Sequence, residues 1–127
     1  MAVRVVGSTG YPVDEDEVRE RAALAYDRSY DPTGLVCQAI AVLASGDRTA
    51  RLPSLKVPTP VIHAAADRMC DVSGGLATAD AIWGAELVVI EGMGHNLPHA
   101  LWPRIAGLIA DHVRGVEAGT ASISSAL

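Results

Sequence analysis

Apolar residues in the first part of the 127-residue chain recur every three or four positions. This spacing is typical of helices with one apolar face. It predicts a helix over about residues 14–29, which ends at Asp31-Pro32 because a residue before proline avoids the helical conformation. A second helix, apolar on most of its surface, is predicted over residues 33–45 and closed by Gly46. Residues 1–12 fit either a short strand or a frayed segment broken by glycine and proline.

The apolar pattern changes after Pro53. Short apolar runs, rich in β-branched residues, now alternate with amphipathic stretches, which indicates buried strands and the helices that cover them. Ser73 has the side chain of an N-cap for the first of these helices, and Pro98 suits the first position of the second. The predicted elements are a strand at 61–63, a helix at 73–83, a strand at 86–90 and a helix at 98–114.

The order strand, helix, strand, helix predicts the α/β fold class with a parallel sheet. Parallel strands bring their carboxyl ends to one edge, where the ligands and catalytic groups of open α/β sheets gather. Asp67 follows the first strand, and His95 follows the second. A carboxylate that accepts a hydrogen bond from one imidazole nitrogen leaves the other nitrogen free to act as a base. We therefore expect Asp67 and His95 to form an acid–base pair.

Composition narrows the classes of protein that this sequence fits. Half of the residues are hydrophobic and a fifth are charged, as in globular domains. The net charge of −5 at pH 7 argues against a nucleic-acid partner, because the phosphate backbone requires a basic surface. The apolar runs are too short for a membrane span or a signal peptide. Cys37 and Cys70 fit no paired motif, so we expect free thiols in a reducing, cytoplasmic setting.

The two predicted strands and the loops that follow them resemble a known family. The segments VPTPVIHAAAD (57–67) and ELVVIEGMGH (86–95) are similar to the end of the α/β-hydrolase fold. In that family a strand followed by HGxxD presents the acid of a catalytic triad, and the next strand, followed by GxGH, presents its base. The resemblance covers about residues 7–114, is strongest to bacterial esterases, lipases and methylesterases, and implies these roles for Asp67 and His95.

The same resemblance divides the chain into three parts. Residues 1–52 correspond to a helical cap-like segment, which such enzymes place before the acid strand. Residues 53–115 correspond to the C-terminal unit of the hydrolase, a parallel βαβα arrangement. Residues 116–127 are rich in small and polar side chains and are expected to form a disordered tail.

The sequence also departs from the family's pattern. Ala64 stands where the family has glycine, which predicts altered backbone angles in the acid loop. Trp83 stands where proline is common, which predicts an exposed side chain. The larger departure is that the chain contains no GxSxG motif, the carrier of the family's serine nucleophile. Ser8, in the GSTG sequence at 7–10, is the nearest match, but it follows no buried strand.

Other side chains near the pair have simpler interpretations. Cys70 lies on the acid's own loop, which argues against a role as nucleophile. His63 is expected to pack at the end of the first strand. His99 could join the pair in a metal site only if a helix continued from position 95 to 99, and Pro98 interrupts such a helix. We therefore expect no metal and no cofactor.

These observations predict an incomplete carboxylic-ester hydrolase that keeps the acid and base, lacks a nucleophile and has little or no activity alone. Its parent reaction would cleave a small ester. A second hypothesis is a non-catalytic assembly module, because open sheet edges and uncovered apolar helix faces favour self-association or a completing partner. A third hypothesis is that the chain is the remnant of an epoxide hydrolase or a haloalkane dehalogenase. These members of the same superfamily have the same fold but use an aspartate nucleophile.

Overall fold

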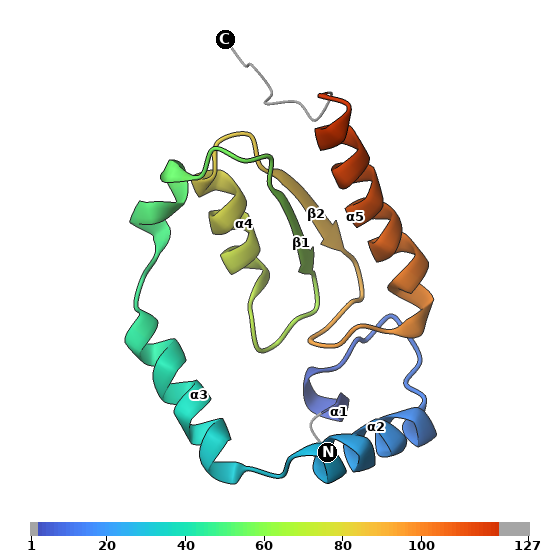
Figure 1. Cartoon of the computed structure of the whole chain (residues 1–127). Helices are drawn as coiled ribbons and strands as arrows, with labels where there is room; N and C mark the ends of the chain where they lie inside the picture. Colours follow the sequence, from blue (N-terminus) through green and yellow to red (C-terminus); the bar gives the residue numbers. More distant parts are fainter. Residues whose placement is uncertain (1–2, 120–127) are drawn as a thin grey trace. The chain divides into compact units, whose positions relative to one another are not determined.

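The computed structural model describes residues 3–119 of the chain. These residues divide into two compact units: one combines residues 3–12 with residues 49–119, and the other is Val13–Arg48 (Figure 1). The sequence grouped residues 1–52 together, whereas the contacts assign the residues before Val13 to the unit that contains the sheet.

Two helices make up the unit Val13–Arg48, as the periodicity predicts. They are α2 (Glu15–Arg28) and α3 (Pro32–Ser45). Asp14 caps α2, since its carboxylate accepts hydrogen bonds from the backbone N–H groups of Asp16 and Glu17, both at 3.0 Å. These N–H groups have no partner inside the helix, so the cap stabilises its first turn.

A two-stranded parallel sheet lies at the centre of the other unit. Its strands are β1 (Pro60–Ala64) and β2 (Glu86–Ile90), which confirms both predicted strands and their parallel pairing. The register places Ala64 opposite Ile90, so both strands end at the same level. The loops that carry Asp67 and His95 therefore leave the sheet side by side.

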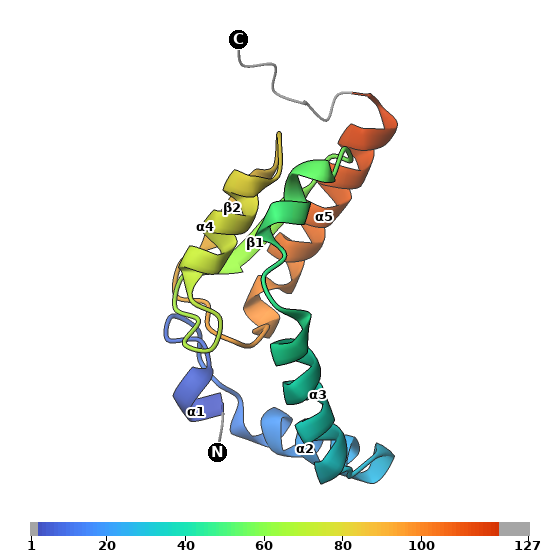
Figure 2. The same cartoon turned by 90° about the vertical axis from the view of Figure 1, so that its left-hand side faces the viewer.

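Two helices cover this sheet, one on each face (Figure 2). They are α4 (Val72–Ala81), which connects the strands, and α5 (Trp102–Glu117). Gly75 of α4 lies against the ring of His63, since a Cβ atom there would come within 2.7 Å of the ring. This close approach lets the helix pack directly on β1.

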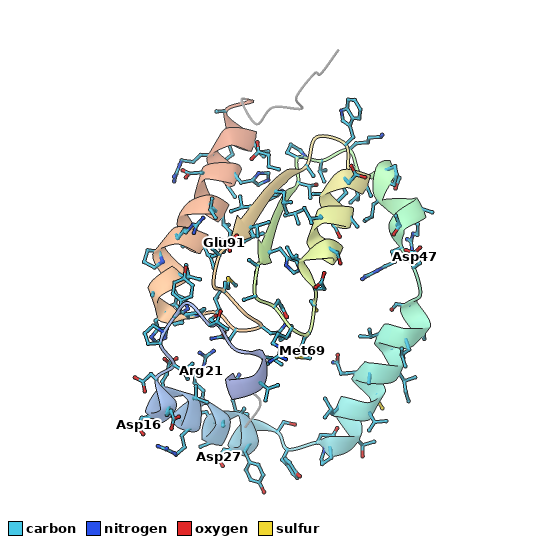
Figure 3. The ribbon with its side chains drawn as sticks, turned by 180° about the vertical axis from the view of Figure 1, so that it is seen from behind. Asp16, Arg21, Asp27, Asp47, Met69 and Glu91 are labelled. Carbon is cyan, nitrogen blue, oxygen red and sulfur yellow. The ribbon has the colours of Figure 1, made fainter. Side chains whose placement is uncertain are left out.

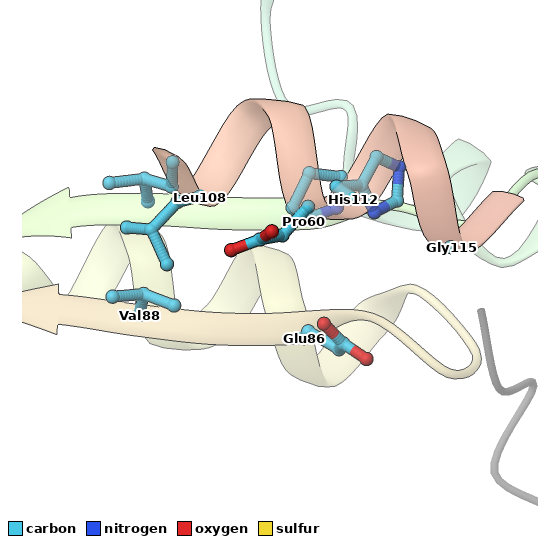
Figure 4. A pocket seen from close by; sticks show the side chains of 8 residues that line it. Pro60, Glu86, Val88, Leu108, His112 and Gly115 are labelled. Carbon is cyan, nitrogen blue, oxygen red and sulfur yellow. The ribbon is translucent and has the colours of Figure 1, made fainter. Parts of the chain in front are cut away.

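The opposite face leaves a hollow of about 250 Å³ between the sheet and α5 (Figure 4). Its lining is mainly apolar around Ile62, Val88 and Leu108, with Glu86 and His112 toward one end. The strand residues of its lining lie within the first three positions of β1 and β2, and neither Asp67 nor His95 lines it. It is therefore separate from the predicted site.

Two local predictions need correction, and two short elements were not predicted. Asp71, not Ser73, is the N-cap of α4, because its carboxylate accepts the Ser73 N–H at 2.9 Å and the helix begins one residue earlier. The last predicted helix is split into a 3₁₀ turn at His99–Leu101 and α5, whose first turn contains Pro103 in place of Pro98. Two further elements, absent from the prediction, are α1 (Val3–Val6) and a 3₁₀ helix η1 (Thr49–Ser54).

The predicted disordered tail lies only partly within the described residues. Helix α5 continues to Glu117, two residues into that range, and residues 120–127 are outside the part of the chain that the structure describes. Between residues 3 and 119, no helix combines the length and apolar character that crossing a membrane requires.

Candidate functional site

Asp67 and His95, the residues expected to act as acid and base, lie within hydrogen-bonding distance of each other. The Nδ1 atom of His95 lies 2.8 Å from Oδ2 of Asp67, although 28 positions separate the residues. The Asp67 side chain is only 9% exposed, while that of His95 is 40% exposed. The carboxylate is thus shielded, and the imidazole reaches solvent, where a substrate could approach.

Backbone groups hold the Asp67 carboxylate in place. Its Oδ1 atom accepts the N–H of Met69 at 2.8 Å and that of Cys70 at 2.9 Å, and Figure 3 shows Met69 in the loop after β1. Partial burial raises the pKa of Asp67, but the hydrogen bonds from Cys70, the His95 ring and Met69 outweigh it and lower this pKa below its usual 3.8. Asp67 is therefore ionised at neutral pH and keeps its orientation toward the imidazole.

Further backbone hydrogen bonds tie the acid loop to the base loop. The Ala65 N–H donates to the carbonyl of Ile90 at 3.0 Å, and the Ala66 N–H donates to that of Met93 at 2.8 Å. The two loops thus extend the pairing of β1 and β2 beyond the strands, up to Asp67 itself.

The segment before α2 packs against the other side of the base loop. The N–H of His95 donates to the Val6 carbonyl at 2.7 Å, and the N–H of Gly10 donates to the Gly92 carbonyl at 2.9 Å. Figure 1 shows these segments side by side, the blue loop after α1 against the orange loop after β2. Gly92 has a φ of +70°, which favours glycine.

Ser8 lies in the middle of this contact and is buried, with 8% of its surface exposed. Its Oγ accepts the N–H of Gly94 at 2.9 Å and donates to Oδ1 of Asn96 at 2.7 Å. A nucleophilic hydroxyl must be reachable by the substrate. The structure therefore gives no support to Ser8 as a nucleophile, in line with its sequence context.

An open hollow of about 330 Å³ lies at the pair, lined by Asp67, Cys70 and His95 among others. One ligand atom from each of these three residues lies within 4.8 Å of the other two, and their types suit zinc. A metal at Nδ1 of His95 would have to replace the hydrogen bond to Asp67. Sequence reasoning considered His99 for this set, whereas its ring lies edge-on to Trp102, with a centroid distance of 4.0 Å.

The two departures from the hydrolase pattern have clear outcomes. Ala64 ends β1 with 5% of its surface exposed, and no residue other than glycine has a positive φ in the part of the chain that the structure describes. The acid loop therefore forms without the strained angle that alanine would resist. Trp83 is 65% exposed, as predicted.

This geometry permits general base chemistry. With Nδ1–H directed to the carboxylate, Nε2 of His95 is the nitrogen that can accept a proton, and the Asp67 charge stabilises the imidazolium that results. Sequence reasoning brought Asp67 and His95 together. It missed the hydrogen bonds of Ser8 with Gly94 and Asn96, because contacts across more than 80 positions have no local signal.

Comparison with known proteins indicates similarity to esterases. No family model matches the chain. The chain is 32% identical over 111 residues to rhodomycin D methylesterase DauP of Streptomyces sp. (strain C5) and to the same extent to rhodomycin D methylesterase DnrP of Streptomyces peucetius. The match covers 87% of this chain and 37% of each methylesterase, so the chain spans little more than a third of their length.

A shorter segment is also similar to part of a much larger protein. The match to polyketide synthase ThaQ of Burkholderia thailandensis is 37% identical over 80 residues, which is 60% of this chain and 4% of the synthase.

Proposed function

We propose that Asp67 and His95 are the acid and base of a carboxylic-ester hydrolase, with the nucleophile supplied by residues outside these 127. The observation that carries this proposal is the 2.8 Å hydrogen bond between Oδ2 of Asp67 and Nδ1 of His95, beyond the ends of adjacent parallel strands. The similarity to rhodomycin D methylesterases supports the class of reaction.

In this mechanism a serine hydroxyl attacks the ester carbonyl, and His95 accepts the hydroxyl proton at Nε2. The resulting imidazolium is stabilised by Asp67 and returns the proton to the departing alcohol. Water then attacks the acyl-enzyme in the same way: His95 accepts a proton from the water and returns it to the serine, which releases the carboxylic acid. The steps require no cofactor. Because a nucleophile and an oxyanion hole supply most of a hydrolase's rate enhancement, the 127 residues alone should have little or no activity.

The direct test is a chimera in which this chain replaces the matching segment of DnrP. We expect the chimera to hydrolyse the methyl ester of rhodomycin D, and His95→Ala to lower kcat roughly 10³-fold or more. The matched control is His112→Ala, which removes an imidazole from α5 and should leave the rate within about twofold.

Two results would contradict the proposal. One is hydrolysis by the chimera that does not depend on His95. The other is a chimera that unfolds cooperatively, and so is folded, yet hydrolyses the ester no faster than buffer.

The isolated chain needs a separate measurement. Purified protein should hydrolyse an activated aryl ester at nearly the background rate, since an imidazole alone is a weak catalyst. Rapid turnover that disappears in His95→Ala would show that the 127 residues contain a complete site, and would refute the proposed need for an external nucleophile.

A second candidate function is assembly, and the surface of α3 favours it. The helix has no buried residue, and its large apolar side chains are mostly solvent-exposed. They are Leu35 (74% exposed), Val36 (57%), Ile40 (59%), Val42 (71%) and Leu43 (81%). An exposed apolar cluster of this kind favours association, because burying it removes apolar area from water.

We expect sedimentation velocity at micromolar concentration to show self-association of the chain. Val36 and Leu43 are seven residues apart and so lie on the same face of α3. The double variant Val36→Glu with Leu43→Glu should shift the chain to the monomer. Leu24→Glu on α2, where the leucine is 61% exposed, is the control. A wild-type monomer at these concentrations would exclude the assembly function.

A further inference from the structure

The GSTG segment at 7–10 contains the one buried polar residue, Ser8, in the part of the chain that the structure describes. Neither the acid–base chemistry nor the helices require it. Burying a hydroxyl costs free energy unless its hydrogen bonds are made. The bonds that Ser8 makes therefore indicate what the segment does.

The hydrogen bonds of Ser8 connect it to the two neighbours of His95, Gly94 and Asn96. The Gly94 N–H donates to its Oγ at 2.9 Å, and both the Oγ and the backbone N–H of Ser8 donate to Oδ1 of Asn96 at 2.7 Å. The residue between them, His95, donates its own N–H to the Val6 carbonyl at 2.7 Å. Three consecutive residues of the base loop are thus bound by one short segment.

The backbone of residues 7–10 approaches the backbone of the base loop too closely for a side chain to fit between them. A Cβ atom on Gly94 would lie 2.4 Å from the carbonyl carbon of Gly7, and one on Gly10 would lie 2.9 Å from Cα of Gly92. These distances are below those that Cβ atoms adopt, so the two backbones meet only because both carry glycine. The loop that carries His95 accordingly has little room to move on this side.

We propose that residues 6–10 act as a clamp on the base loop and that Ser8 is the positioning residue that fixes His95 relative to Asp67. The acid loop holds the base loop on one side, through the Ala66 N–H and the Met93 carbonyl at 2.8 Å. The clamp holds it on the other. The His95 side chain is 40% exposed, so packing around the ring constrains it only on its covered part. The description of His95 as a base rests on the proposed function, whereas the position of its ring does not.

The test uses the full chain and reads the loop by NMR. In Ser8→Ala the Gly94 N–H loses its acceptor and Asn96 loses a donor. We expect the amides of Gly94 and His95 to exchange with solvent roughly tenfold faster, because an unmade buried hydrogen bond weakens the local structure. Amides of β1 and β2 should keep their rates within about twofold, and the ring signal of the His95 Nδ1–H bound to Asp67 should weaken.

A pair of variants at Asn96 separates the hydrogen bond from the volume of the side chain. Asn96→Asp keeps an oxygen that accepts from Ser8 and should preserve both signals. Asn96→Leu removes the acceptor of the Ser8 N–H and hydroxyl and should weaken the His95 ring signal as Ser8→Ala does, whereas Gly94 keeps the Ser8 Oγ as its acceptor and should exchange less rapidly than in Ser8→Ala. Ser45→Ala is the control for hydroxyl loss, since its Oγ donates to Ala41 within α3 at 2.8 Å.

The clamp is refuted if Ser8→Ala leaves the exchange of Gly94 and the ring signal unchanged. It is also refuted if exchange accelerates equally in β2, because Ser8 would then stabilise the whole unit and position nothing in particular. Both signals are recorded without turnover. An inactive chimera in which the ring signal still depends on Ser8 would therefore remove the hydrolase function and leave the clamp intact.

Discussion

The Nδ1 atom of His95 and Oδ2 of Asp67 lie 2.8 Å apart because two parallel strands end at the same level. Ala64 pairs with Ile90 at the end of the sheet, and each loop then runs only a few residues to Asp67 or His95. The pair is thus set by the backbone register. Substitutions that leave the register intact should change chemistry without changing the fold.

The variant Asp67→Asn in the chimera tests whether Asp67 orients the His95 imidazole, because it leaves the size of the side chain at position 67 unchanged. The amide has the same size but does not hold the imidazole in the tautomer that leaves Nε2 free. We expect kcat to fall about 10³- to 10⁴-fold with little change in KM, as measured by steady-state hydrolysis. Asp80→Asn, an exposed carboxylate on α4, is the control. A loss of less than about tenfold would mean that Asp67 does not orient His95.

Acidification should destabilise the chain through the same carboxylate. Partial burial raises the pKa of Asp67, but the hydrogen bonds from Cys70, His95 and Met69 lower it below 3.8 in the folded chain. Such a group contributes stability above its unfolded pKa and loses it as the pH falls through the folded pKa. Below about pH 4, the urea midpoint of the wild type should therefore drop more steeply than that of Asp67→Asn. Parallel pH curves for the two proteins would contradict this.

Two glycine-to-alanine substitutions should have opposite signs. Gly94→Ala places a Cβ atom 2.4 Å from the Gly7 carbonyl and should destabilise folding by about 1–3 kcal/mol, because two backbones would have to separate. Gly107 lies inside α5 with nothing within 4 Å of a Cβ atom. Gly107→Ala should stabilise by roughly 0.5–1 kcal/mol, since it reduces the entropy of the unfolded chain. Urea unfolding measures both, and equal effects would contradict the close approach.

Ile90 should dominate the stability of the sheet-containing unit. It is 0% exposed, and the fully buried core contains few other large side chains. Ile90→Ala should cost about 2–5 kcal/mol, from lost burial and the cavity left behind. Leu43→Ala, at a residue that is 81% exposed, should change stability by less than about 0.5 kcal/mol in the monomer. A small effect at Ile90 would show that the unit can repack around a cavity.

Local pattern was sufficient for the main elements and for the pair. The helices α2 and α3 followed from residue spacing and end signals, and the strands from short β-branched runs. A strand–helix–strand unit characteristically places its strands parallel in one sheet, which predicted the adjacency of the Asp67 and His95 loops as well. Each of these inferences uses interactions between residues near one another in sequence.

The contacts around Asp67 and His95 could be seen only in the tertiary structure. The sequence around Ser8 looks like a glycine-rich turn, and nothing within it indicates that its hydroxyl meets Gly94, 86 positions away. Similarly, Ser73 and Asp71 both have side chains that can cap α4, and the path of the preceding loop selects Asp71. Helical periodicity and capping are local, so residue type reveals them. The approach of two glycine backbones depends on how the whole unit packs, and only the folded chain brings them together.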